Sequence, residues 1–193
     1  MFPTIEIHLP SWLAAYAQSY VPTTSLPARM EFVIGAAMGN VEHATGGPFA
    51  AGIFAIDSGE LVGIGVNLVT AENLSILHAE MVAFVTAQRA LGTYDLGGPG
   101  LAAHELMTSA EPCAMCFGAV PWSGVRRVVC GARSEDAERI GFDEGPKSQN
   151  WESDLQQRGI AVMRDICRNQ AVRAFSEYTR RGGQIYNSRE ARD

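Results

Sequence analysis

The sequence predicts a three-layer α/β/α sandwich around a mixed five-stranded sheet. Apolar residues recur at helical spacing through residues 28–41, and the two apolar runs that follow are joined by turn-forming residues 57–60. Residues 103–130 then have the pattern of strand, helix and strand, an order that implies a parallel crossover with its helix on one face of the sheet. A hairpin beside a parallel crossover makes the sheet mixed.

The remaining elements follow from the same patterns of apolar spacing and glycine or proline breaks. In chain order we expect a helix at 28–41, strands at 49–56 and 61–69, a helix from 78 to about 91, a strand at 103–109, a helix at 113–122, a strand at 125–130, a short piece at 151–158, an edge strand at 160–163 and a helix at 164–181. This divides the chain into a proline-rich extension (1–27) wrapped on the domain, one domain (28–181) and a C-terminal tail (182–193).

Composition describes an ordinary globular domain and argues against some classes of partner. The chain has 193 residues, 47% hydrophobic and 19% charged, and a net charge of −6 from 15 basic and 21 acidic residues. Proteins that bind nucleic acid usually present a basic surface, and this chain is acidic, so we expect no polynucleotide partner. Residues 1–10 lack the features of a signal peptide, and no run approaches the roughly 20 apolar residues that span a bilayer. A cytoplasmic protein without membrane attachment is expected.

Two short segments carry the chemistry of this chain. His78-Ala79-Glu80 is followed, 32 residues after its glutamate, by Pro112-Cys113-Ala114-Met115-Cys116. A structural zinc site is closed by four protein ligands, whereas a catalytic one has three and leaves the fourth position to water. The chain has only four cysteines, and the other two stand alone. The economical interpretation is an open zinc site with one ion bound by His78, Cys113 and Cys116, beside which Glu80 is free to act.

The spacing of these residues supports a common metal site. Cys113 and Cys116 stand at i and i+3, which places both sulfurs on one face of a helix. Pro112 suits a helix start, and the positive end of a helix favours the thiolate form that zinc requires. His78 likewise opens an amphipathic stretch. A redox C-x-x-C within a βαβ unit is the alternative. Such a pair does not require an upstream H-x-E, so the joint pattern favours zinc catalysis.

The combination H-x-E…P-C-x-x-C is the signature of zinc-dependent base deaminases. Over about residues 28–181 the chain resembles the cytidine deaminase-like superfamily, and within it is most similar to bacterial guanine deaminases. The segments that carry the closer resemblance are 47–50, 66–67, 108–113, 122–125 and 140–146. The last segment is the most discriminating, because guanine deaminases carry a second acidic residue there.

The resemblance implies a role for each matching position. It implies zinc held by His78, Cys113 and Cys116, with Glu80 as the proton shuttle and Glu144 as a second acid for the leaving amine. It also implies contacts between the purine and Asn67, Phe49, Trp122 and the backbone N–H of Ala79. We also predict that Tyr186, in the C-terminal tail, serves as a docking element and contacts the substrate. Members of the superfamily are commonly dimers, so a homodimer is expected.

The resulting hypothesis is hydrolytic deamination of a small nucleobase, guanine, to xanthine and ammonia. The extension at 1–27 and the polar stretch after Cys130 differ from the small guanine deaminases, so other substrates stay open. These are cytosine, guanosine, a triazine amine such as ammeline, and adenosine in tRNA. From a different class, a non-catalytic zinc-binding or redox domain is the remaining alternative.

Overall fold

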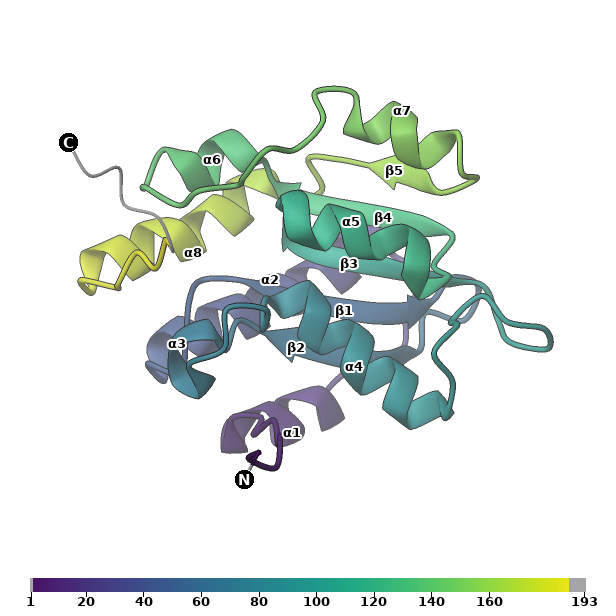
Figure 1. Ribbon diagram of the computed structural model, residues 1–193, viewed down its shortest axis with the longest axis horizontal. Helices are drawn as coiled ribbons and strands as arrows, with labels where there is room; N and C mark the ends of the chain where they lie inside the picture. Colours follow the sequence, from purple (N-terminus) through teal and green to yellow (C-terminus); the bar gives the residue numbers. More distant parts are fainter. Residues whose placement is uncertain (1, 188–193) are drawn as a thin grey trace.

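The computed structural model describes residues 2–187, which form one mixed sheet between two layers of helices (Figure 1). Its strands are β1 (Ala50–Ala55), β2 (Leu61–Val66), β3 (His104–Ala110), β4 (Arg127–Ala132) and β5 (Ala161–Met163). Their order is β2-β1-β3-β4-β5, with β1 antiparallel to β2 and β3, and with β3, β4 and β5 parallel. The predicted fold class and the mixed five-stranded sheet are confirmed.

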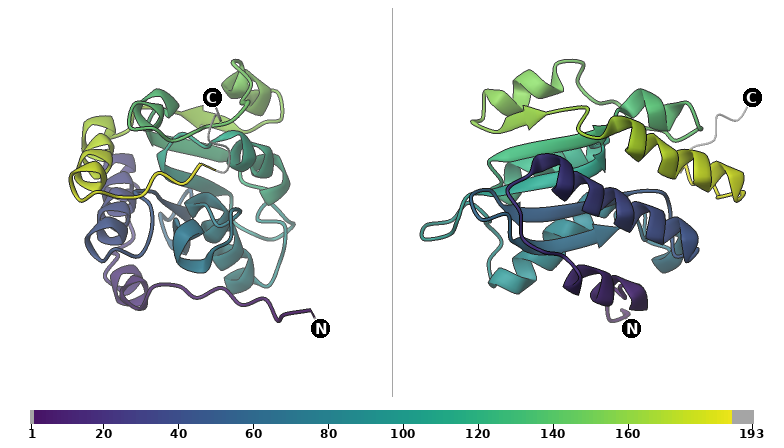
Figure 2. Two further views of the ribbon diagram at one scale, coloured as in Figure 1. Left: turned by 60° about the vertical axis from the view of Figure 1, so that its left-hand side comes forward. Right: turned by 180° about the vertical axis from the view of Figure 1, so that it is seen from behind.

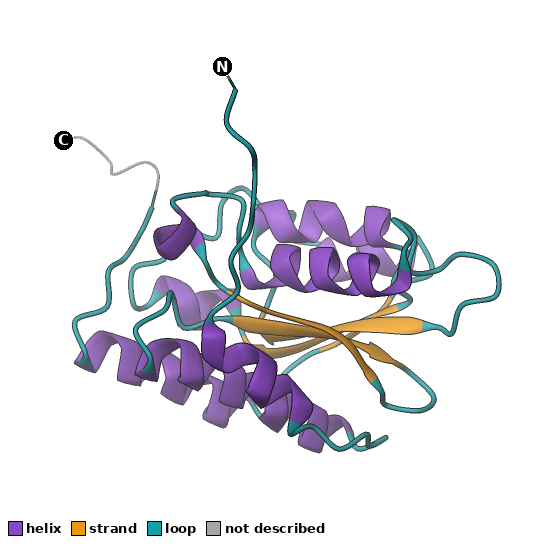
Figure 3. Cartoon of the chain, turned by 90° about the horizontal axis from the view of Figure 1, so that it is seen from below, coloured by secondary structure: helices purple, strands orange, loops and turns teal. Residues whose placement is uncertain are grey.

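Helices cover both faces of the sheet (Figure 3). On one face lie α4 (Ala79–Leu91) and α5 (Ala114–Ser123), and on the other lie α2 (Leu26–Glu42) and α8 (Arg168–Arg180), as the front and rear views show (Figures 1 and 2). Neighbouring residues of β1 point to opposite faces, so that Ile53 joins the core under α4 and Phe54 the core under α2. None of the helices within residues 2–187 is long and apolar enough to cross a bilayer.

Two glycines bring α4 directly against β2. A Cβ atom on Gly65 would lie 2.3 Å from the carbonyl oxygen of Ala79, and one on Gly63 would lie 2.5 Å from the backbone nitrogen of Ala87. No side chain fits at either position, so the helix packs on the bare strand. The start of α4, with His78 as its N-cap, is therefore fixed beside the carboxyl end of β2.

Element boundaries differ from the prediction where local turn chemistry decides them. The last helix, predicted from residue 164, begins at Arg168 because Asp165 and Cys167 have φ of 64° and 55° and turn the chain first. In α2, which begins at Leu26, the Ser25 side chain accepts a hydrogen bond from the N–H of Ala28. The predicted boundary at residue 27 thus falls in the first turn of α2, and the division into extension, domain and tail stays a prediction.

The sequence did not predict four short helices as separate elements, although it indicated a short piece at residues 151–158. They are α1 (Ser11–Gln18), α3 (Val69–Glu72), α6 (Ser134–Glu138) and α7 (Trp151–Gln156). The first belongs to the predicted extension and packs on α2, where the Tyr16 hydroxyl donates to the carbonyl oxygen of Phe32 at 2.6 Å. Leu13 is buried in the same contact.

Candidate active site

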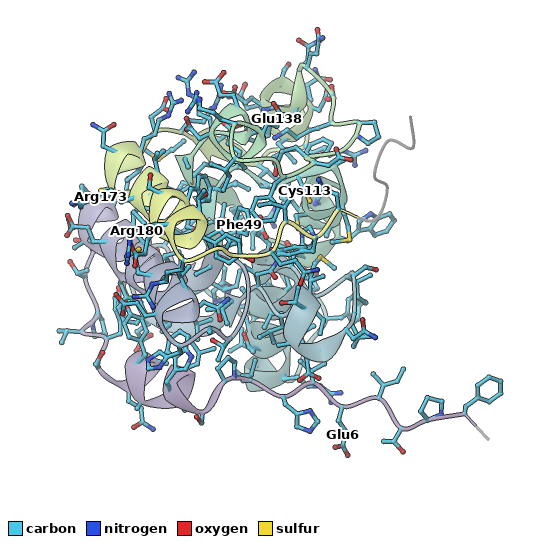
Figure 4. All side chains as sticks on the ribbon, turned by 90° about the vertical axis from the view of Figure 1, so that its left-hand side faces the viewer. Glu6, Phe49, Cys113, Glu138, Arg173 and Arg180 are labelled. Atoms are coloured by element: carbon cyan, nitrogen blue, oxygen red, sulfur yellow. The ribbon has the colours of Figure 1, made fainter. Side chains whose placement is uncertain are left out.

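A cavity of about 360 Å³ opens where β2 and β3 end and β1 begins. The start of antiparallel β1 lies beside the carboxyl ends of β2 and β3, so Phe49 and Asn67 meet there, and the N–H of Asn67 donates to the carbonyl oxygen of Phe49 at 3.0 Å. The lining residues are Phe49, Asn67, Val69, Ser75, His78, Ala79, Glu80, Glu111, Cys113, Ala114, Met115, Phe142, Asp143, Glu144, Gly145, Pro146, Tyr186 and Asn187. Figure 4 locates Phe49 and Cys113 on the side of the molecule that the C-terminal segment crosses.

The three predicted zinc ligands converge at the starts of two helices. His78 is the N-cap of α4 and Cys113 the N-cap of α5, with Cys116 one turn further along. Their donor atoms all lie within 4.8 Å of one another, and Cys113 Sγ is 3.4 Å from His78 Nδ1. Ligand atoms about 2.0–2.3 Å from a tetrahedral zinc ion are roughly 3.3–3.8 Å apart, so the set fits this metal. Pro112 precedes the N-cap and does not occupy the first helical position.

The pKa values of the residues in this cluster are shifted by burial and by their mutual contacts. A hydrogen bond with Cys116 lowers the pKa of the Cys113 thiol to about 4, helped by His78. The same hydrogen bond and burial raise the pKa of Cys116. Burial opposes protonation of His78, but Cys113, together with Glu80, raises the pKa of that imidazole. A divalent cation among these atoms would favour both thiolates and the neutral imidazole.

Glu80 lies beside the ligands without belonging to their set. It is buried in the first turn of α4, where its Oε2 accepts from Cys116 Sγ at 3.4 Å and its Oε1 from Thr108 Oγ1 at 3.4 Å. Burial, followed by the charge on Cys113, raises the pKa of this carboxyl group. The side chain is thus held at the metal position by the sheet and by a ligand.

Glu144 reaches the same cavity from the turn 141–146. Gly141 and Gly145 have φ of 104° and 70°, which allow the sharp turn. Glu144 is 8% exposed, and its pKa is raised to about 8, first by burial and then by the charge on Cys113. Its neighbour Asp143 is exposed, with Oδ1 accepting from the N–H of Gly145 at 2.8 Å. Both acidic residues of the turn thus line the cavity, but only Glu144 is buried.

The other predicted contacts that lie in the cavity offer an amide, an aromatic face and a phenol. Asn67 is buried; its Oδ1 accepts from the N–H of Val69 at 3.2 Å, while its Nδ2 has no acceptor among residues 2–187. The Phe49 ring packs edge-on against Phe142 at 5.0 Å. The hydroxyl oxygen of Tyr186 is buried with no partner in the described part of the chain. Ala79 is the first residue of α4, so its N–H has no intrahelical acceptor.

Trp122 is not part of the cavity, contrary to the prediction. It lies in the last turn of α5, at the opposite end of the helix from Cys113, and is 85% exposed. A helix of ten residues is about 15 Å long, so closeness in sequence to the ligands does not bring this side chain to them.

Sequence reasoning also missed residues that support the site. Thr108 contacts Glu80, and Ser134 contacts Glu144 at 3.2 Å between Ser134 Oγ and Glu144 Oε2. Lys147 donates in turn to Ser134 Oγ. Thr108 stood in a segment noted for its resemblance, but the other two gave no signal, because single serines and lysines in polar stretches are usually solvated.

Comparison with known proteins agrees with this geometry. Residues 28–132 match the model of the cytidine and deoxycytidylate deaminase zinc-binding region, which is more than half of the 193 residues. The chain belongs to this family of zinc-binding deaminases.

Within the family, the chain is similar to guanine deaminases. The solved guanine deaminase from Nitrosomonas europaea is 46% identical with a TM-score of 0.89, covering 93% of this chain and 98% of that one. A structure solved in complex with 2,6-diaminopurine is 47% identical with a TM-score of 0.89, over 95% of this chain and 96% of that one. Guanine deaminase from Bacillus subtilis is 38% identical over 104 residues, which span 54% of this chain and 62% of that protein.

Proposed function

We propose that this chain is a guanine deaminase that hydrolyses guanine to xanthine and ammonia. The observation that carries the proposal is a second buried carboxyl group, Glu144, facing the cavity that also holds Glu80 and the metal ligands. The similarity to a guanine deaminase over 93% of this chain and 98% of that one supports it. A deaminase needs one acid–base group for the attacking water and benefits from another for the leaving amine.

His78, Cys113 and Cys116 would hold a zinc ion, which when bound supplies hydroxide from water at neutral pH. Glu80 then accepts a proton and delivers it to a ring nitrogen of guanine as hydroxide adds to C2. Its position supports this role, because Thr108 on the sheet donates to the carboxyl group and holds it beside the metal ligands. General acid–base groups must lie within hydrogen-bond reach of the proton they move.

The leaving amine needs a proton of its own. Ammonia departs from the tetrahedral carbon only after its nitrogen is protonated, and a positioned general acid typically contributes about 10²–10⁴-fold to such a step. Glu144 can supply that proton, since burial raises its pKa to about 8 and keeps the carboxyl group protonated near neutral pH. A bound cation would lower this value, and the hydrogen bond to Ser134 fixes the group in either state.

Guanine recognition is assigned to the polar and aromatic groups that the metal does not use. We place the Asn67 amide against the purine edge, since its Nδ2 has no acceptor among residues 2–187, and the Ala79 N–H against the ring carbonyl. Phe49 and Tyr186 would then cover the ring, with the Tyr186 hydroxyl available to a polar ring atom. Buried polar groups left without partners discriminate strongly between substrates.

The test is ammonia release from a panel of substrates, with zinc content measured in parallel. The panel contains guanine, guanosine, cytosine, ammeline and a transfer RNA with adenosine at the target position. We expect turnover of guanine well above the rest by enzyme with one zinc ion per chain. Turnover of another member without guanine turnover identifies a different deaminase, and full zinc content with no turnover identifies a non-catalytic domain.

We further propose a homodimer in the cytoplasm. Apolar side chains are exposed on the outer face of α4 and α5, among them Val85 at 39%, Leu91 at 37% and Trp122 at 85%. All four cysteines are free, as is usual in a reducing compartment. Light scattering should give twice the mass of the chain, and Trp122→Glu should shift it toward the monomer. A wild-type monomer at working concentration contradicts the assembly.

A further inference from the structure

A line of polar contacts continues from Glu144 away from the cavity. Ser134 Oγ donates to Glu144 Oε2 at 3.2 Å, and Lys147 Nζ donates to Ser134 Oγ and to the carbonyl oxygen of Pro112, the latter at 2.9 Å. Glu111 Oε2 lies 3.7 Å from Lys147 Nζ and accepts from the backbone N–H of Ser134 at 3.2 Å. Ser134 is thus held through both its backbone and its side chain.

The outer end of this line is rigid. The Lys147 side chain is 10% exposed, and its ammonium group lies 5.0 Å from the centre of the Trp151 ring. Arg164 binds the other oxygen of Glu111 at 2.6 Å and lies over the same ring. A lysine that is mostly buried and paired has few alternative positions, so the donor facing Ser134 stays in place.

Ser134 is the first residue of α6 and follows its N-cap, Arg133. The N-cap is the position whose side chain usually accepts from a backbone N–H of the first turn, so Ser134 has no capping role. At the start of α6 it is Asp136 Oδ2 that accepts from a backbone N–H, that of Arg133 at 3.0 Å. The Ser134 hydroxyl group is therefore available for Glu144.

Counting donors fixes the direction of the hydrogen bonds. An ammonium group has only donors and a hydroxyl group has a single proton. Ser134 Oγ therefore accepts from Lys147, and its own proton goes to Glu144 Oε2, because the hydroxyl group has no other acceptor among residues 2–187. Glu144 Oε1 accepts no hydrogen bond from residues 2–187. Any proton that Glu144 carries is thus directed to Oε1.

We propose that Ser134, held by Lys147, is a positioning residue that fixes the Glu144 carboxyl group and presents its transferable proton on Oε1 to the leaving amine. The inference rests on the proposed role of Glu144 and adds how that role is set up. Without the serine hydroxyl, the proton could sit on either oxygen and the carboxyl group could turn. Turnover would fall while substrate binding stayed nearly unchanged.

The first experiment compares Ser134→Ala with wild-type, zinc-loaded enzyme on guanine. We expect kcat to fall by about tenfold, the order for the loss of one hydrogen bond, with KM changed by less than about twofold. Ser134→Thr, which keeps the hydroxyl group, should restore most of the rate. Ser176→Ala on the exposed face of α8 is the matched control and should match wild type. Lys147→Met, which leaves Ser134 in place, should show a smaller loss of the same kind.

The second experiment asks whether Ser134 acts through Glu144. In a Glu144→Gln background Ser134→Ala should cause no further loss, because the proton it directs is gone. With 2-chlorohypoxanthine, whose chloride leaves without protonation, Ser134→Ala should hydrolyse the substrate at nearly the wild-type rate. Equal losses in both backgrounds, or on both substrates, overturn the inference, as does a Ser134→Ala variant that turns over guanine at the wild-type rate.

These outcomes separate the inference from the proposed function. If Glu144→Gln is slow and Ser134→Ala is not, the inference fails and the role of Glu144 stands. If Glu144→Gln is as fast as wild type, the role of Glu144 fails and the inference falls with it. If wild-type enzyme does not release ammonia from guanine, the proposed function itself is wrong.

Discussion

The two sides of the cavity are built in different ways. On the metal side, His78 and Cys113 are the N-caps of α4 and α5, helices of 13 and 10 residues. On the acid side, Glu144 comes from a turn, and its support comes from Ser134 and from the C-terminal segment that contains Asn187. Regular backbone positions the first set of side chains, whereas individual side-chain hydrogen bonds position the second.

This difference predicts which substitutions each side of the cavity should tolerate. Helix starts on a packed sheet are fixed by many apolar contacts, so a single surface change hardly moves them. A turn held by a few polar contacts shifts when any one of them is lost. The metal ligands lie within residues 28–132, which match the family model, whereas Glu144 lies beyond them.

The largest effects are expected on the metal side, where Cys113→Ser and Glu80→Gln should both lose turnover but should differ in whether they keep zinc. Cys113→Ser removes a ligand, so zinc content and turnover should both be lost. Glu80→Gln should keep its zinc and its fold but lose about 10²–10⁴-fold in kcat, because the amide cannot shuttle a proton. Metal analysis beside ammonia release checks both. Loss of zinc in the Glu80 variant would mean that this residue holds the metal.

Next in size is the contrast between the two neighbouring acids of the turn. Glu144→Gln should lower kcat by about 10²-fold with KM little changed, since the amide keeps size and hydrogen bonding but donates no acidic proton. Asp143→Asn should be much milder, because Asp143 is exposed and its carboxylate accepts from the N–H of Gly145. Steady-state kinetics on guanine checks the pair. A slow Asp143 variant beside a fast Glu144 variant would reverse the assignment.

The sequence predicted the metal side because that side depends on short-range spacing. Cys113 and Cys116 share a helix turn, and His78 begins an amphipathic helix, while the signature H-x-E…P-C-x-x-C joined the two segments. The contact that the resemblance implied for Trp122 is not found, since nine residues along a helix lead away from its start.

The acid side was only partly predictable. Glu144 was proposed from its segment and lies in the cavity, but Ser134 and Lys147 meet it through turns and a short helix whose paths depend on tertiary contacts. Likewise the predicted start of α8 was four residues too early, because the apolar spacing does not indicate the left-handed backbone of Asp165 and Cys167. Periodicity finds regular elements and says little about how turns fold back on them.

A smaller effect should follow from loosening the turn through the C-terminal segment. Asn187 Oδ1 accepts from the N–H of Asp143 at 3.0 Å, and its Nδ2 donates to the carbonyl oxygen of Gly141 at 2.8 Å. Each such bond contributes about 1 kcal/mol, so Asn187→Ala should lower kcat/KM for guanine by roughly tenfold. Gln170→Ala, which loses one surface hydrogen bond on α8, is the control. Equal rates for both variants would show that the turn holds itself.

The smallest effect concerns the contact between α6 and α8, which supports the acid side. This contact depends on ion pairs, whereas the metal side depends on apolar packing. Asp136 on α6 is buried and binds Arg168 of α8 through two hydrogen bonds, at 2.7 and 2.9 Å. Arg168 holds the pKa of this carboxyl group well below its ordinary value of 3.8. A lowered folded-state pKa adds stability that is fully present above the unfolded value and is lost as pH falls through the folded one.

Asp136→Asn should therefore lower the free energy of unfolding by about 1 kcal/mol near pH 6, a modest value because the partner arginines are partly exposed. The difference from wild type should begin to shrink below pH 3.8, where the carboxylate of the unfolded chain takes up its proton while the folded one, with its lowered pKa, still carries its charge. Urea unfolding of both proteins at pH 6 and at pH 3 checks this, and any release of zinc in acid affects both alike. Asp57→Asn, in the exposed hairpin turn, should show no difference at either pH. A constant difference for Asp136→Asn would mean that this aspartate supports α6 through its shape alone, and that the acid side is no more electrostatic than the metal side.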